Sequence, residues 1–247
     1  MINPNLPTLA LDCSVKKITP ALIKNQLICA SYDAVPVGSQ SGAMMGVIDN
    51  LLKQGQTGLD EIKNVIFCNG PGSFTSLRVG LATLMGLFWG RAVGVTEVSS
   101  LLYRCYSCLD FQAAVIISTV VLGRNRFAVG ILDCTENQKQ FEEKILSAAD
   151  LEKTITDLDA GLFQTLDHVQ KNTKASLRPV IISGLGLDAI EARVSHESIC
   201  FLKYDAATPQ GFVKLLTENP CDNKPLNQCR VNYMLQPDLG LAQLPAL

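Results

Sequence analysis

The sequence predicts an α/β protein made of two related halves, because the same succession of elements occurs twice. In the first half, an apolar run at residues 64–68 leads into a glycine turn and a helical pattern over 73–90. In the second half, an apolar run at 179–184 also ends in a glycine turn, and a further run at 198–202 precedes a helical pattern over 208–217. Ligands of open α/β sheets bind beyond the carboxyl ends of parallel strands, so we expect any site near these turns.

The hydrophobic pattern predicts the remaining elements. Strands are expected over residues 6–11, twice within 15–34, over 113–119 and over 126–132, and helices over 44–53, 98–109 and 147–170. The helix at 44–53 has apolar residues at the spacing of one helical face. We divide the chain into an amino-terminal α/β domain, residues 1–110, and a carboxyl-terminal α/β domain, residues 111–247.

The composition indicates a globular protein that does not hold nucleic acid unaided. Of the 247 residues, 47% are hydrophobic and 18% are charged, and the formal net charge is −2. Neutralising phosphates needs a basic surface, so any contact with nucleic acid is expected through a partner. The chain opens without the charged and apolar regions of a signal peptide, and its apolar helix at 79–90 is too short to span a bilayer. We therefore expect a cytoplasmic protein with no membrane contact.

The nine cysteines indicate reduced thiols, because no secretory signal is recognisable. Cys29, Cys68 and Cys200 lie in apolar runs, where thiols pack as small hydrophobic side chains. Cys105 and Cys108 form one Cys-x-x-Cys, but neither a second pair nor a nearby histidine accompanies them. Their spacing places both on one face of a helix, so we interpret them as packed thiols and not as a metal or redox site.

No catalytic machinery is recognisable in the sequence. The two histidines, His168 and His196, do not form a His-x-x-x-His pair, and a metal-dependent hydrolase needs several protein ligands in a shaped site. Ser73, Ser118 and Ser183 lack the Gly-x-Ser-x-Gly elbow of the α/β-hydrolases. We therefore predict no catalytic residue and no metal.

The most informative segment is the glycine turn, where residues 69–80 read Asn-Gly-Pro-Gly-Ser-Phe-Thr-Ser-Leu-Arg-Val-Gly. Gly70 and Gly72 lack the Cβ atoms that would block an unusual backbone path. Ser73 or Thr75 can cap the helix that follows, and the amino terminus of a helix attracts anions. Together with Arg78, these residues form a candidate anion-binding turn. A purely structural elbow is the alternative.

The residue sequence of this segment resembles the Gly-Pro-Gly-Ser-Phe-Thr-Gly-Leu-Arg signature of the TsaB (YeaZ) family, with serine at position 76 in place of glycine. Two further segments are similar to this family: the first strand with its Asp12-Cys13-Ser14 ending, and Gly-Val-Thr-Glu-Val-Ser-Ser-Leu at residues 94–101. The resemblance covers roughly residues 6–104. The second half departs from the family pattern, for example at residues 119–127, so the chain is identified as a divergent member.

The resemblance implies a fold and a function. TsaB-like proteins are degenerate members of the actin-like (ASKHA) ATPase superfamily, with two ribonuclease-H-like halves. They are non-catalytic scaffolds for threonylcarbamoyl transfer to the adenosine beside the tRNA anticodon. The implied partners are a TsaD-like catalytic subunit, a TsaE-like ATPase, and tRNA reached through the complex. The isolated chain needs no cofactor, and ATP or ADP is expected only at the joint of the complex. The missing histidine pair argues that the chain is not the catalytic paralogue TsaD itself.

Asp12 and Ser14 occupy the degenerate phosphate-loop position that the resemblance implies. In active members of the superfamily, the aspartate that ends the first strand lies near metal-bound phosphates. Here residues 15–17 have no glycine that would let backbone N–H groups surround a triphosphate. We therefore expect Asp12 to cap its own turn. A stand-alone ATPase or small-molecule kinase of the same superfamily is the competing hypothesis.

Two helices of the first half are expected to form a partner interface, because the helix at 73–90 is apolar on nearly all sides. TsaB-like proteins pair through these helices, with TsaD or with a second copy of themselves. A homodimer is therefore an alternative, and so is mutual cover by the two halves of this chain. The expected interface residues are Met44, Met45, Ile48, Leu51, Leu77, Leu81, Leu84 and Phe88.

Overall fold

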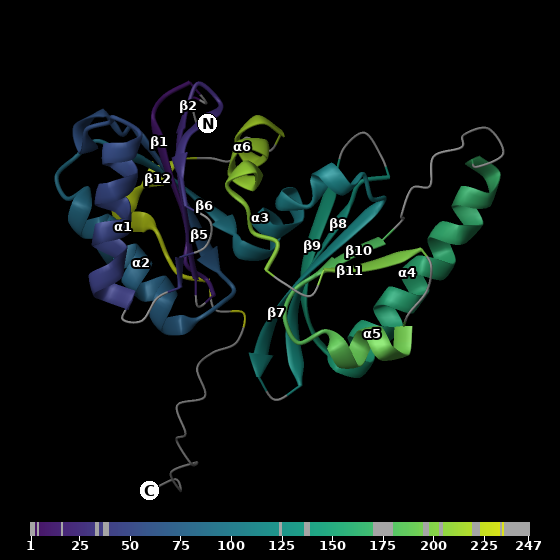
Figure 1. Ribbon diagram of the computed structural model, residues 1–247. Helices are drawn as coiled ribbons and strands as arrows, with labels where there is room; N and C mark the ends of the chain where they lie inside the picture. The colour runs from purple at the N-terminus through teal and green to yellow at the C-terminus, as the bar shows by residue number, and fades with distance from the viewer. Residues whose placement is uncertain are drawn as a thin grey trace, which may run out of the picture.

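The protein consists of two β-sheets that lie side by side, with helices on the outer face of each sheet and two helices between them (Figure 1). The computed structural model describes residues 3, 5–15, 17–32, 35–36, 40–123, 125–135, 139–169, 180–194, 198–202, 205–218, 223–232 and 234. Among the helices in these ranges, none has the length and hydropathy needed to cross a bilayer.

The first sheet has the order β12-β6-β5-β1-β2-β3, and β4 pairs with the end of β2. Its strands are β1 (Thr8–Asp12), β2 (Lys17–Lys24), β3 (Leu27–Ser31), β4 (Val35–Pro36), β5 (Asn64–Gly70), β6 (Gly94–Ser99) and β12 (Lys224–Pro225). Strands β1, β2 and β3 form an antiparallel meander, whereas β5 and β6 run parallel to β1.

The second sheet repeats this arrangement with the order β11-β10-β7-β8-β9. Its strands are β7 (Val115–Gly123), β8 (Arg126–Asp133), β9 (Gln140–Ser147), β10 (Val180–Ser183) and β11 (Ile199–Leu202). Strands β7, β8 and β9 form an antiparallel meander, and β10 and β11 run parallel to β7. Each strand of the first meander and parallel pair therefore has an equivalent in the second sheet.

The helices are duplicated in the same way. They are α1 (Gln40–Gln54), α2 (Phe74–Leu87), α3 (Ser100–Ser107), α4 (Ala148–Val169), α5 (Asp188–Val194) and α6 (Pro209–Glu218), with short 3-10 turns at Leu59–Glu61, Leu109–Phe111 and Leu226–Gln228. In each half, one helix follows the third strand, one joins the parallel strands and one follows the last of them. The expected fold class, two related α/β halves, is confirmed by this shared topology.

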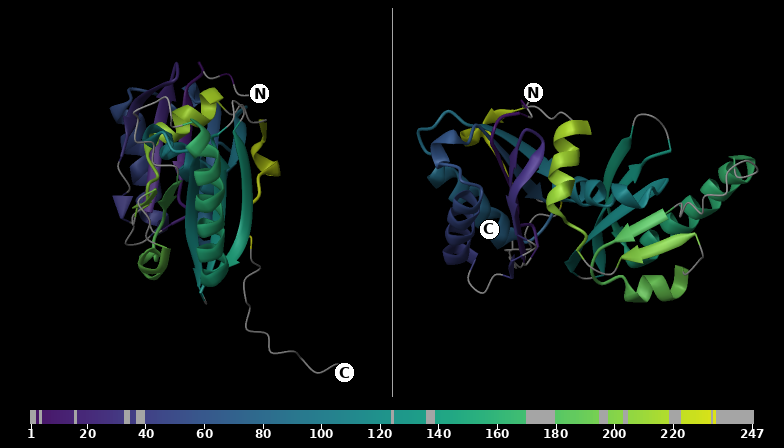
Figure 2. Two further views of the ribbon diagram at one scale, coloured as in Figure 1. Left: turned by 90° about the vertical axis from the view of Figure 1, so that its right-hand side faces the viewer. Right: turned by 45° about the horizontal axis from the view of Figure 1, so that its top comes forward.

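Helices α3 and α6 form the joint between the sheets, and Figure 1 and the right-hand view of Figure 2 agree on their central position. They belong to a core that also contains side chains of both sheets, such as Ile66 and Ile116. The rings of Tyr103 on α3 and Phe212 on α6 stack with centroids 4.0 Å apart. Separate cores fill the space beneath α1 and α2 and beneath α4 and α5.

Several elements differ from the sequence-based expectation. The helix predicted over 98–109 is present as α3, but it begins only at Ser100, because the preceding segment Gly94–Ser99 forms an unpredicted strand, β6, that pairs in parallel with β5. Strands β9 and β12 and helix α5 were not predicted. β12 pairs with β6, so the end of the chain returns to the first sheet although residues 111–247 were assigned to the second domain. The division at residue 110 stays a prediction.

Candidate functional site

The glycine turn between β5 and α2 packs tightly against its own chain. Gly70 has φ of +123°, a conformation that side-chain-bearing residues rarely adopt. A Cβ atom on Gly72 would overlap the backbone of Ser14, whose carbonyl accepts a hydrogen bond of 2.5 Å from the N–H of Ser73. On the other side, the N–H of Asn232 donates to the carbonyl of Asn69 at 2.7 Å. The close approach that Gly72 permits is therefore used by the loop after β1.

The first turn of α2 is likewise satisfied from within the chain. The Ser73 hydroxyl accepts hydrogen bonds from the N–H of Ser76 at 3.4 Å and from its hydroxyl at 2.8 Å, as expected of a capping residue. Thr75 is exposed, and the guanidinium of Arg78 lies over the ring of Phe74, 3.7 Å from the centroid. These contacts favour the structural elbow, and anion binding at the turn stays a prediction.

A buried charged cluster lies where the two halves meet. Arg104 on α3 donates from Nη2 to Asp12 at 3.0 Å and from Nε to Asp205 at 2.8 Å, and its Nη2 also donates to Asp205 at 3.2 Å. Nη1 donates to the carbonyl of Ser100 at 2.9 Å. The side chains of Arg104, Asp12 and Asp205 are 2%, 1% and 8% exposed, so solvent hardly screens these pairs. We call these three residues the Arg104 triad.

The electrostatics of the triad follow from its burial and its composition. Burial raises the pKa of Asp12, and the charge of Arg104 opposes that rise. Burial by itself lowers the pKa of Arg104, but the charges of Asp12 and Asp205 outweigh it and raise this pKa above its ordinary value. Arg104 thus remains a cation that holds two carboxylates, one on each side of the joint.

Asp12 also behaves as the sequence predicts, because its Oδ1 accepts a hydrogen bond of 3.0 Å from the N–H of Ser14 and caps the turn after β1. Its partners Arg104 and Asp205 were missed. One signal in the sequence could have found Arg104, which is a lone charge within an otherwise uncharged helical segment, residues 98–109. Burying such an arginine requires a carboxylate from elsewhere in the chain. The sequence does not show which carboxylate this is.

Most of the residues expected at the partner interface are instead buried inside the first half. Six of them are at most 2% exposed and belong to the core beneath α1 and α2, namely Met44, Ile48, Leu51, Leu77, Leu84 and Phe88. Only Met45, which is 48% exposed, and the partly exposed Leu81 reach the surface. The premise that these two helices carry apolar faces that the chain itself cannot cover is therefore wrong for the six, because the sheet and the two helices cover them.

Glu97 on β6 binds the segment after α6 through hydrogen bonds. Its carboxylate accepts hydrogen bonds from the Lys224 ammonium, from the N–H of Arg230 and from the Asn69 side-chain amide, the last at 3.3 Å. The Glu97 side chain is 12% exposed, so these bonds are largely shielded from water. One carboxylate thus ties the segment after α6 to the strand end beside the glycine turn.

Of the eight cysteines that the structure describes, five are buried, Cys134 and Cys200 are partly buried and Cys29 is exposed. Cys105 and Cys108 are buried, and burial raises the pKa of the Cys108 thiol to about 12. Cys29 was expected in a buried run, but it is exposed on the edge strand β3. Within the described ranges, no three His, Cys, Asp or Glu side chains come together as a metal site. His168 lies in α4, its side chain outside the described part, and His196 lies outside the described residues.

The fold and the joint define a class: a two-halved α/β protein whose sheets are duplicated and are held together by a buried ion-pair cluster. A family model described as "TsaD: tRNA N6-adenosine threonylcarbamoyltransferase" matches residues 39–210, more than half of the chain. The chain belongs to this family, as a divergent member of its TsaB (YeaZ) branch.

Relatives and a solved structure support this placement. The chain is 28% identical over 110 residues to a "tRNA threonylcarbamoyladenosine biosynthesis protein TsaB" of Haemophilus influenzae, covering 44% of this chain and 46% of the relative. A protein of the same name from Bacillus subtilis is 27% identical over 93 residues, 38% of this chain and 41% of the relative. The matches thus span less than half of these relatives. The structure "YeaZ from Pseudomonas aeruginosa" shares the fold, with a TM-score of 0.65 and 17% identity over 93% of this chain and 100% of that chain.

Proposed function

We propose that this chain is a non-catalytic scaffold in tRNA threonylcarbamoyladenosine biosynthesis and that it acts by pairing with a TsaD-like catalytic subunit. Membership of the family and the printed names of the TsaB relatives support the pathway. The pairing is supported by one surface of the first half, the outer face of α2 together with the neighbouring part of α1.

The α2 part of this surface carries a single charge. Between residues 74 and 90 the only charged residue is Arg78. The exposed positions along the outer face of α2 carry Thr75, Arg78, Ala82, Gly86 and, just beyond the helix, Trp89. On the neighbouring helix α1, Met45 and Gly46 are exposed, and so are Asp49 and Lys53, which pair with each other. Most solvent-facing helices carry charged residues on this side, so the composition fits a surface that another polypeptide covers.

The two glycines on this surface give the strongest support for the proposal. A Cβ atom on Gly46 or Gly86 would meet nothing within 4 Å, so neither glycine is required by packing within the chain. Glycine inside a helix costs about 1 kcal/mol relative to alanine. Glycine does allow another backbone to approach closely. We infer that a partner helix lies across Gly46, Ala82 and Gly86, which replaces the buried residues of the expected interface.

The test is co-purification with the TsaD-like protein of the same organism. Gly86→Arg and Ala82→Arg place a long cation on the outer face and should abolish association, while the variants remain folded because both positions are open to solvent. Leu51 and Leu84 are unsuitable for this purpose, since a charge at these fully buried positions would unfold the chain. Ala189→Arg, at a position on α5 that is also exposed, is the matched control.

Two results would contradict the scaffold proposal. One is failure of the unmodified chain to associate at micromolar concentration, with or without tRNA and ATP. The other is equal association of Gly86→Arg and Ala189→Arg. Light scattering of the chain alone and with the TsaD-like protein separates a heterodimer from a homodimer through the same face. A TsaE-like ATPase, tRNA bound through the complex, and ATP or ADP at its joint are further parts of this proposal.

The competing hypothesis, an ATPase or small-molecule kinase that works unaided, is tested by a thermal shift with Mg-ATP. A ligand that binds only the folded state raises the unfolding temperature. We expect no shift, because the carboxylate of Asp12 is already bound by Arg104 and the turn after β1 is filled by Ser73 and Gly72. A clear shift with Mg-ATP, absent with Mg²⁺ alone, would favour the enzyme.

A further inference from the structure

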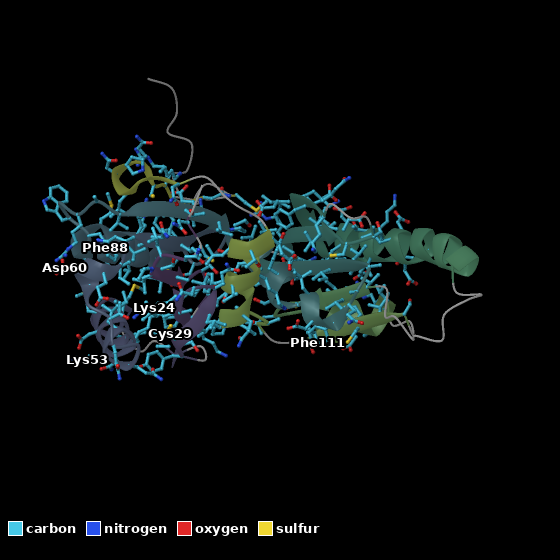
Figure 3. The ribbon with its side chains drawn as sticks, turned by 90° about the horizontal axis from the view of Figure 1, so that it is seen from above. Lys24, Cys29, Lys53, Asp60, Phe88 and Phe111 are labelled. Carbon is cyan, nitrogen blue, oxygen red and sulfur yellow. The ribbon has the colours of Figure 1, made fainter. Side chains whose placement is uncertain are left out.

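A hollow at the carboxyl end of α2 is a surface feature that the scaffold proposal does not use. It has a volume of about 800 Å³ and lies between the loop that leads from α2 to β6 and the segment that contains β12. Phe88 and Asp60 mark this end of the molecule, which lies away from α4 (Figure 3). We call this hollow the Trp89 groove. Its size is that of a site for a small ligand or a short peptide.

The groove is apolar, and its charges are already matched. Met85, Phe88, Trp89, Val93, Pro225 and Leu226 supply apolar lining. The two cations at the groove are paired within the chain, Arg91 with Asp60 and Lys224 with Glu97. An anionic ligand would therefore find no free cation among these two. The lining suits an uncharged, apolar occupant.

Trp89 makes the groove unusual for a surface left to water. It is the single tryptophan of the chain and is 84% exposed at the rim, while the neighbouring Phe88 is 2% exposed. Grooves lined by aromatic side chains recognise proline-containing segments in the polyproline II conformation, which has three residues per turn. A segment with apolar residues at every third position would place all of them on one side of such a helix.

The chain contains a segment of this kind. Residues 235–247, which lie outside the described part of the chain, read Leu-Gln-Pro-Asp-Leu-Gly-Leu-Ala-Gln-Leu-Pro-Ala-Leu and carry one charge, Asp238. Leu241, Leu244 and Leu247 follow one another at a spacing of three, with Pro245 among them. Segments that stay in solvent are typically rich in charged and polar residues, so this composition favours a covered location.

The geometry also lets the segment reach the groove of its own chain. Met234 packs against the cluster of Leu101, Val120 and Ala128, and Leu101 lies just beyond the end of β6, whereas Gly94 at the start of β6 lines the groove. The two places are thus separated by the length of β6, six residues, which corresponds to about 20 Å at 3.3 Å per residue. An extended chain covers this distance in about six residues. Residues 235–240 are therefore long enough to span the distance from Met234 to the groove. Leu241 is then the first of the three leucines at a spacing of three that can reach the groove.

We propose that residues 241–247 dock in the Trp89 groove of the same chain, with Leu241 and Leu244 against the aromatic lining. Docking covers Trp89 and places the segment beside Met85 and Gly86, at the end of the face that the scaffold proposal assigns to the partner. The segment would then compete with a partner that reaches this end of α2. The inference does not depend on the scaffold proposal, because it concerns the isolated chain.

The fluorescence of Trp89 tests the docking in the full chain. With excitation at the red edge, where tyrosine does not absorb, the single tryptophan reports only on the groove. The unmodified protein should emit at a short wavelength and resist quenching by acrylamide. Leu241→Ser combined with Leu244→Ser should shift the emission to longer wavelength and remove that protection. Gln236→Ser combined with Gln243→Ser, which keeps the leucines, is the matched control and should match the unmodified protein.

Two further measurements test whether residues 241–247 of the same chain are what occupies the Trp89 groove. A synthetic peptide of residues 235–247, added to the Leu241→Ser, Leu244→Ser protein, should restore the short-wavelength emission. Ala92→Glu, an exposed substitution in the groove, should prevent this restoration. Identical emission and quenching of the unmodified protein and the double leucine variant would overturn the proposal. It would also be overturned if the protection disappeared on dilution together with a dimer in light scattering, since a second copy would then supply the segment.

Discussion

The Nη2 atom of Arg104 donates a hydrogen bond of 3.0 Å to the carboxylate of Asp12, a residue 92 positions earlier in the chain, and both side chains are almost completely buried. The same guanidinium holds Asp205 in a bidentate contact. Buried ion pairs add little stability compared with an apolar replacement of the whole cluster, but removal of one partner leaves an uncompensated charge. The Arg104 triad is therefore a position where a single substitution has a large effect.

Arg104→Leu should lower the free energy of unfolding by about 3–5 kcal/mol, because it leaves the carboxylates of Asp12 and Asp205 buried without their cation. Urea denaturation followed by circular dichroism measures this difference. Arg193→Leu removes a pair with Glu152 in which Arg193 is 62% exposed, and should cost at most about 1 kcal/mol. If the two substitutions cost the same, the triad does not have the structural role described here.

The raised pKa of Glu143 predicts that the stability of the protein depends on pH. Burial raises the pKa of this carboxyl above 4.5, although a hydrogen bond from Ser99 opposes the rise. The folded state then binds the proton more tightly than the unfolded state, so the contribution of Glu143 to stability falls as the pH rises through the raised pKa. Glu143→Gln removes this loss. The urea midpoint of the variant relative to the unmodified protein should rise between about pH 4 and about pH 7.

The control for this pH dependence is Glu142→Gln, which removes the same charge from the exposed neighbour that pairs with Lys144. Its midpoint relative to the unmodified protein should change less over the same range. A Glu143→Gln variant with a flat difference across the range would show that this carboxyl titrates alike in the folded and unfolded states.

Gly72 and Gly86 should respond in opposite ways to the same change. Gly72→Ala forces a Cβ atom into the backbone of Ser14, where nothing can move aside cheaply, and should destabilise the protein by about 1–3 kcal/mol. Gly86→Ala adds a methyl group in open space within α2 and should stabilise the isolated chain by about 1 kcal/mol. Thermal unfolding of both variants gives the comparison. Equal effects of the two would contradict the packing described for the glycine turn.

Glu97→Ala should release the segment that returns to the first sheet. The substitution removes the acceptor for Lys224, for the N–H of Arg230 and for the side chain of Asn69. Limited trypsin digestion followed by mass spectrometry should then show faster cleavage after Arg230, because the Lys224–Pro225 bond resists trypsin in any state. Glu152→Ala, which breaks a surface pair with Arg193, should leave the cleavage rate unchanged.

The fold was largely predictable because the elements that define it are strongly periodic or strongly apolar. The runs that became β1, β5, β7 and β10 were predicted to within a few residues. β6 was missed because Thr96 and Glu97 interrupt its apolar run, and β9 because it is an edge strand with the charged triplet Glu142, Glu143 and Lys144. Such strands are specified by their neighbours in the sheet, which a local pattern does not contain.

The site was less predictable than the fold. The motif around Gly70 and Gly72 indicated the turn, and Asp12 was recognised as the cap of its own turn, but its contact with Arg104 joins residues far apart in sequence. The expected interface failed for a different reason. Helical periodicity identifies which side chains of α2 share a face, but it does not say which of two apolar faces lies against the sheet. In the structure, the face with the larger side chains is the buried one.

The return of β12 to the first sheet, by way of α6, makes the second half an insertion within the first. The polypeptide crosses from one half to the other twice, once between α3 and β7 and once between β11 and α6. Any opening of the two halves must therefore bend both crossings together, about an axis that passes through them. A fragment that stops at residue 110 would lack the edge strand β12 and the helix α6, and Tyr103 on α3 would lose Phe212, the ring on which it stacks.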